Sequence, residues 1–141
     1  MLYKPEHGWS HITIGDWSDR CSYLNDVPEE LCTAVKESIR NRRGIAHFDA
    51  EGYEYTMIFD TSFNCVHIIT NNEDGEWVYK TIECNISTLA LELANDILAH
   101  IDSWAEWFGG NLSIDERAKR YIDLSRDCLR LIEITKKGGI E

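Results

Sequence analysis

Apolar and polar residues alternate most regularly in the middle of the chain, within residues 44–84. At residues 53–59 every second residue is aromatic or otherwise apolar, which is typical of a strand with one buried face. A run rich in β-branched residues follows at 65–69. The next turn cluster, 71–75, ends in Asp-Gly, which suits a tight hairpin. The segment is therefore predicted to form three or four consecutive antiparallel strands.

Three helices are predicted around this segment, because apolar residues there repeat every three or four positions. They span about 26–43, 87–108 and 113–137, and the first and third begin with capping sequences. The buried stripe of the last helix is predicted to consist of Ala118, Tyr121, Ile122, Cys128, Leu129 and Ile132.

An alternating stretch at Trp9–Trp17 predicts an opening strand, and residues 19–25 are predicted to be irregular. A run of strands followed by helices indicates an α+β fold. We expect an antiparallel sheet of about four or five strands with three helices, the last two forming an antiparallel hairpin packed on one face. With 141 residues, the chain (1–141) is predicted to be a single domain.

The net charge of −11 is concentrated in the middle of the chain. Residues 1–43 carry −1, residues 44–85 carry −7, residues 86–112 carry −4, and residues 113–141 carry +1. Such a surface repels phosphate, so nucleic acid and anionic membranes are not expected as partners. It suits a basic protein partner, although ordinary solubilising charge is an alternative explanation.

Partner contacts are predicted from the acidic residues of the strand-rich segment, with two tryptophans as apolar anchors. Tryptophan is enriched at binding hot spots. Trp77 directly follows the predicted hairpin, whereas Trp107 belongs to a WAEWF cluster that could equally complete the core. The predicted contact residues are Asp49, Glu51, Glu54, Asp60, Glu73, Asp74, Glu76, Trp77 and Trp107.

The chain contains no nucleophile elbow, phosphate-binding loop, dinucleotide fingerprint, HExxH or EF-hand pattern. His47 and Asp49 share one face of a predicted strand, and His67 on a neighbouring strand could join them as a metal site or general base. The alternative is a solvated polar strand face. We predict no enzymatic activity, no metal and no cofactor.

Five cysteines stand at wide, irregular spacing without a CxxC pair. The N-terminal sequence lacks the apolar core of a signal peptide, and no apolar run is long enough to span a membrane. We therefore expect five reduced thiols in a cytoplasmic protein, with a disulfide or a metal site as the alternative.

Two stretches, Ser22–Leu31 (SYLNDVPEEL) and Phe48–Tyr55 (FDAEGYEY), resemble bacterial immunity proteins of polymorphic toxin and contact-dependent growth inhibition systems. The resemblance covers about the first half of the chain. It implies a cytoplasmic inhibitor that binds a cognate toxin domain and blocks its active site. Many such toxins are basic nucleases, which an acidic surface would suit. Immunity proteins share no common site, so the resemblance assigns no contact residue.

Two other functions remain open at the level of sequence. The first is a small metal-assisted enzyme that uses His47, Asp49 and His67. The second is an adaptor subunit that docks to a larger assembly through a sheet edge or a helix pair.

Overall fold

The computed structural model describes residues 1–107 and 112–138 and has the predicted α+β fold. It contains a two-stranded and a four-stranded antiparallel sheet. The elements follow in the order β1 (Trp9–Ile14), β2 (Trp17–Ser22), α1 (Val27–Asn41), β3 (Arg43–Asp49), β4 (Glu54–Asp60), β5 (Cys65–Asn71), β6 (Trp77–Glu83), α2 (Ile86–Ala99), α3 (Ile101–Ala105) and α4 (Ile114–Lys136).

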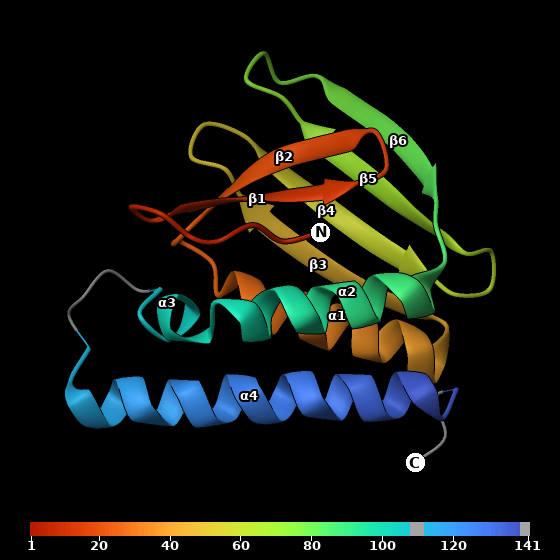
Figure 1. Cartoon of the computed structure of the whole chain (residues 1–141). Helices are drawn as coiled ribbons and strands as arrows, with labels where there is room; N and C mark the ends of the chain where they lie inside the picture. The colour runs from red at the N-terminus through yellow and green to blue at the C-terminus, as the bar shows by residue number, and fades with distance from the viewer. Residues whose placement is uncertain (108–111, 139–141) are drawn as a thin grey trace.

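The four-stranded sheet is a meander in the order β3-β4-β5-β6, which confirms the run of strands predicted for the middle of the chain. Each strand is antiparallel to the next. The β3–β4 and β5–β6 loops therefore lie at one end of the sheet, and the β4–β5 loop lies at the other (Figure 1). This alternation decides which acidic residues come together.

One face of the sheet is buried under α1, and we call it the inner face. It carries Phe48, Tyr55, Met57 and Phe59, each at most 1% exposed. Helix α1 lies so close to β3 that a Cβ on Gly44 would stand 1.7 Å from the carbonyl oxygen of Ala34. Glycine is therefore required at this contact, because the backbone of α1 cannot give way by that distance.

The predicted irregular segment before α1 contains a second strand. β2 pairs with β1 around a turn in which Gly15 has a positive φ of 58°. The hairpin also packs on the inner face, where the ring of Trp17 meets that of Tyr55 at 5.6 Å and the Tyr55 hydroxyl donates to the carbonyl of Arg20. β2 was not predicted because its sequence, WSDRCS, is mostly polar.

The long helix predicted after the sheet is two helices. His100, with φ −130° and ψ 36°, ends α2 and precedes the short α3. The predicted end of that helix, at Phe108, lies outside the described residues. Trp104 of α3 is fully buried and meets the ring of Trp107 at 4.9 Å.

Helix α4 packs against the other helices rather than against the sheet, so α1 and α2 lie between α4 and the strands (Figure 1). This refines the predicted helix hairpin, since α4 reaches the sheet only through other helices. Arg120 forms a bidentate ion pair with Asp26 at the start of α1, at 2.8 and 3.2 Å. The same guanidinium donates to the carbonyls of Trp104 and Ala105, so it ties α4 to both α1 and α3.

The buried stripe predicted for α4 is partly wrong. Cys128 is buried, but Tyr121, Ile122 and Leu129 are 42%, 60% and 60% exposed. The buried face is instead centred on Leu124 and includes Cys128, Leu131, Ile134 and Thr135. The prediction failed because the apolar arc of α4 is wider than the surface that α1, α2 and α3 cover.

Candidate functional site: the acidic end of the sheet

Six of the seven predicted acidic contact residues gather at one end of the four-stranded sheet, where the β3–β4 and β5–β6 loops lie (Figure 1). The two loops meet there, because a Cβ on Gly52 would stand 3.6 Å from Oε1 of Glu73. All six side chains are exposed. We call this surface the acidic end; it comprises Asp49, Glu51, Glu54, Glu73, Asp74 and Glu76.

The β3–β4 loop is held in a defined shape. Glu51 adopts a left-handed backbone conformation with φ 58°, and its amide donates to Oδ1 of Asp49 at 2.8 Å. Arg20 of β2 donates to the carbonyls of Ala50 and Glu51 at 3.0 and 3.2 Å. These hydrogen bonds fix the carboxylates of this loop relative to the sheet.

The β5–β6 loop is organised by one side chain. Oδ1 of Asn72 accepts hydrogen bonds from the amides of Asp74 and Glu76, at 3.1 and 3.0 Å. Gly75 supplies the positive φ, 79°, that a tight hairpin turn needs. The carboxylates of Glu73, Asp74 and Glu76 are therefore presented by a folded turn.

Negative charge at the acidic end is poorly neutralised. Within the described residues, no lysine or arginine forms an ion pair with any of its six carboxylates. Glu54 lies 3.2 Å from Nε2 of His47, a contact that is ionic only when the imidazole is protonated. Arg20 reaches this end, but its guanidinium is held by backbone carbonyls and lies 5.1 Å from the ring centres of Trp9 and Tyr53.

A shallow hollow of about 300 Å³ opens at this end, lined by Asp49, Gly52, Tyr53, Glu54, Asn71 and Asn72. Burial, together with the hydrogen bond that its hydroxyl donates to Asp19, raises the pKa of Tyr53 to about 12. The phenol therefore stays neutral at physiological pH. Carboxylates and amide oxygens around such a hollow are suited to accept the donors of a lysine or arginine side chain.

The outer face of the sheet adjoins the acidic end, and no described helix or strand covers it. Asp49, Glu54, Asn71 and Trp77 form one cross-strand row. Trp77 and Tyr79 are 58% and 72% exposed, and Ile45 on β3 is 67% exposed. Trp77 thus stands directly beside the carboxylates, whereas Ile45 lies four residues from Asp49 along β3.

Tyr79 and Ile45 were missed by the sequence analysis. The signal for Tyr79 was available, since a residue two positions from Trp77 in a strand faces the same side. The exposure of Ile45 could not be predicted in this way. The alternating sequence of β3 does not show which of its two faces the helices cover.

Two predicted contact residues do not lie on this surface. Asp60 ends β4 at the opposite end of the sheet, and its side chain is only 3% exposed. There it accepts hydrogen bonds from Nε of Arg43 and from the amide of Phe63, both at 3.2 Å. Trp107 is 4% exposed, and its indole N–H donates to the carbonyl of Asn25 at 2.7 Å. Both residues are structural.

His47 and Asp49 share the outer face of β3 as predicted, but His67 does not join them. His47 is held by Thr56 Oγ1 at 2.8 Å, and His67 lies between Thr81 Oγ1 at 3.0 Å and Cys65 Sγ at 3.4 Å. The two histidines stand on β3 and β5, which are separated by β4 and therefore by about 10 Å. No group of three potential metal ligands occurs among the described residues.

The five cysteines are free thiols, and four of them are buried. Burial raises the pKa of Cys21 to about 12, so its thiol stays protonated and is a poor nucleophile. Burial also raises the pKa of Cys65 and Cys84.

No family model, curated protein or solved structure matches this chain. In the part of the chain that the structure describes, every helix is too short or too polar to cross a membrane.

Proposed function

We propose that this protein is a cytoplasmic immunity protein that binds and neutralises a cognate bacterial toxin domain and has no enzymatic activity of its own. The observation that carries the proposal is the acidic end. Six exposed carboxylates gather there, and no lysine or arginine of the described residues forms an ion pair with them. Beside them lies a sheet face that no described helix or strand covers and that exposes Trp77 and Tyr79. The resemblance of residues 22–31 and 48–55 to immunity proteins supports the same function.

The toxin is proposed to be basic, and a nuclease fits best. A nuclease site must attract phosphate with lysine and arginine side chains, and those side chains also bind carboxylates. The six carboxylates of the acidic end would occupy such a site in place of the nucleic acid backbone. The toxin would thereby lose access to its substrate.

In this proposal, charged groups affect the association rate and aromatic groups affect the dissociation rate. Long-range attraction between the acidic end and a basic toxin accelerates association, and it weakens as salt screens it. Desolvated aromatic contacts at Trp77 and Tyr79 slow dissociation. The complex should therefore form faster at low salt and be held mainly by the outer face of the sheet.

The experiment is capture of partners from an extract of the source organism, with a low-salt and a high-salt wash, followed by co-expression of the captured domain with this protein. The expected partner is a basic domain that arrests growth when produced alone and is harmless in the presence of this protein. Capture of a housekeeping assembly alone, or a basic domain whose toxicity is unaffected, would refute the proposal.

The surface assignment is tested by a matched pair of variants. Glu73→Lys/Asp74→Lys/Glu76→Lys reverses three charges at the acidic end and should abolish protection. Glu6→Lys/Glu37→Lys/Glu116→Lys changes the net charge equally at three other exposed acids and should protect normally. Equal loss of protection in both variants would show that net charge matters and the acidic end does not.

A further inference from the structure

Helix α4 carries a second apolar surface, which no other described part of the chain covers. Ile114, Tyr121, Ile122 and Leu129 are 83%, 42%, 60% and 60% exposed. With Ala118 and Ser125 they fall within an arc of about 100° when successive residues are 100° apart. We call these six residues the α4 stripe. It extends about 22 Å along the helix at 1.5 Å per residue, and it adjoins the face that packs on α1 and α2.

The order of residues in the α4 stripe is symmetric about its centre. Large side chains, Ile114 and Leu129, stand at its two ends. Small ones, Ala118 and Ser125, come next, and Tyr121 and Ile122 form the middle. An antiparallel second copy would therefore place Ile114 opposite Leu129, Ala118 opposite Ser125, and Tyr121 opposite Ile122. Each residue then faces a residue of similar size from the other copy. This is the self-complementary contact that an isologous two-fold interface requires.

Two hollows flank the middle of the α4 stripe. One, of about 520 Å³, lies between Ile114 and Tyr121 and is bordered by Ala105 and Glu106 at the end of α3. The other, of about 460 Å³, lies between Ile122 and Leu129. Tyr121 and Ile122 line both hollows, so they form the ridge between them. In a two-fold pair, the end residues Ile114 and Leu129 can enter the hollows of the other copy.

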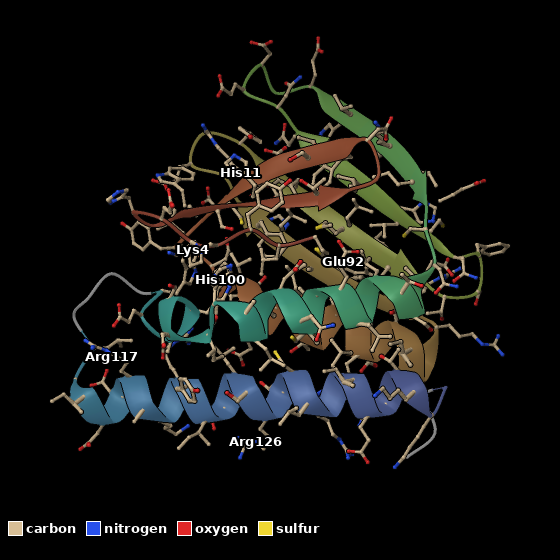
Figure 2. All side chains as sticks on the ribbon, viewed as in Figure 1. Lys4, His11, Glu92, His100, Arg117 and Arg126 are labelled. Carbon is tan, nitrogen blue, oxygen red and sulfur yellow. The ribbon has the colours of Figure 1, made fainter. Side chains whose placement is uncertain are left out.

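Charges beside the α4 stripe favour the same antiparallel arrangement. Along one flank Asp115 comes first, then Lys119 and Asp123, and finally Arg126. When the second copy runs antiparallel to the first, Asp115 of one copy comes near Arg126 of the other. Lys119 of one copy likewise comes near Asp123 of the other. Arg126 is 68% exposed and points away from the rest of the molecule, whereas Arg117 points toward α3 (Figure 2). The guanidinium of Arg126 contacts Asp123 of its own chain at 2.6 Å and has further donors for a second carboxylate.

We propose that a second copy of this chain binds antiparallel along the α4 stripe and forms a symmetric dimer. A contact dominated by one helix pair lies at the small end of stable interfaces, so the dimer should be of micromolar affinity. Helix α4 lies on the side of the molecule opposite the β5–β6 loop (Figure 1). A dimer would therefore leave both acidic ends free, and it does not depend on the proposed inhibitory function.

Sedimentation equilibrium of the full chain tests this proposal. The expected result is a monomer–dimer equilibrium over micromolar concentrations. Ile122→Glu should make the protein monomeric throughout that range. Ile45→Glu, which changes a similarly exposed isoleucine on the sheet, should leave the equilibrium unchanged. Circular dichroism confirms that both variants are folded. A chain that stays monomeric at millimolar concentration, or a dimer that Ile122→Glu does not dissociate, would overturn the proposal.

A charge exchange tests the antiparallel register. Asp115→Arg and Arg126→Asp should each weaken the dimer about five- to tenfold, because each contact occurs twice per dimer. The double variant should return to within about twofold of the original dissociation constant. The two residues are about 16 Å apart along one helix, so recovery cannot come from a contact within one chain. Absence of recovery in the double variant would refute the register and with it the proposal.

Discussion

The two faces of the four-stranded sheet are built from the same alternating strands but meet different surroundings. On the inner face, α1 approaches β3 so closely that a single methyl group at Gly44 has no room. On the outer face, Ile45, the next residue, is 67% exposed. The inner face is closed by backbone contact, whereas the outer face exposes Trp77 and Tyr79 near carboxylates that form no lysine or arginine ion pair within residues 1–107 and 112–138. Apolar residues thus maintain the fold on one face and are exposed to solvent on the other.

The largest expected effect tests the closed face directly. Gly44→Ala should destabilise the protein by about 3 kcal/mol or more, because its Cβ would overlap the Ala34 carbonyl and the backbone must move. Ile45→Ala, one residue away on the open face, should change the free energy of unfolding by less than about 0.5 kcal/mol. Urea denaturation measures both. Similar values for the two variants would mean that the faces do not differ as described.

The contrast between closed and open surfaces extends to α4. Arg120 is 17% exposed and joins Asp26, Trp104 and Ala105, whereas Arg126 on the same helix is 68% exposed. Arg120→Met should lower the free energy of unfolding by about 2–3 kcal/mol, because it leaves the carboxylate of Asp26 unpaired in a mostly buried site. Arg126→Met, the matched control, should cost less than about 0.5 kcal/mol. Thermal unfolding at fixed pH distinguishes the two.

Trp77 and Trp107 provide the next test, since one is 58% and the other 4% exposed. Trp77→Ala should weaken binding to the captured toxin domain by about 2 kcal/mol, roughly thirtyfold, with little change in stability. Trp107→Phe removes the hydrogen bond to the Asn25 carbonyl and should cost about 1 kcal/mol of stability while binding is kept. Calorimetric titration measures the binding affinity, and urea denaturation measures the free energy of unfolding. If the effects were reversed, Trp77 would not be the anchor.

The smallest expected effect is a dependence of stability on pH. A hydrogen bond between the carboxyls of Glu29 and Asp26, together with the partial desolvation of this otherwise exposed side chain, raises the pKa of Glu29 from 4.5 to about 7. The folded state thus holds this proton more tightly than the unfolded state. The stabilisation is complete below pH 4.5 and is lost as the pH rises through 7.

Glu29→Gln should remove this part of the pH dependence, with a gain in stability above pH 7. Because Glu29 is exposed to solvent, the gain should be below about 1 kcal/mol. Urea denaturation at pH 5 and pH 8 measures it. Parallel pH profiles for the variant and the original protein would contradict the assignment to Glu29.

The fold was largely predictable because local rules decided it. The alternation around Tyr55 placed Tyr55, Met57 and Phe59 on the buried face, and the turn at residues 71–75 formed the expected hairpin. Local rules do not show which elements, distant in the sequence, pack against a given face of a helix or strand. The apolar arc of α4 was evident in the sequence, but only the packing of α1, α2 and α3 decides which part of it stays exposed.

The candidate surface was predictable to the same extent. Carboxylates in the loops at one end of the meander were exposed as expected. Asp60 is the last residue of β4, but it is buried and accepts hydrogen bonds from Arg43 and from the amide of Phe63. Trp107 was ambiguous in sequence, and its burial depends on the carbonyl of Asn25, a residue 82 positions away. A contact at that separation leaves no trace in a single sequence.

The central claim, that the acidic end binds a basic toxin, is tested most directly by the association rate with the captured toxin domain at low and high salt. The account predicts that Glu73→Lys/Asp74→Lys/Glu76→Lys slows association at low salt by about tenfold or more and flattens its salt dependence. Glu6→Lys/Glu37→Lys/Glu116→Lys should behave nearly as the original protein. Equal rates for all three proteins, or equal slowing of the two variants, would contradict the claim.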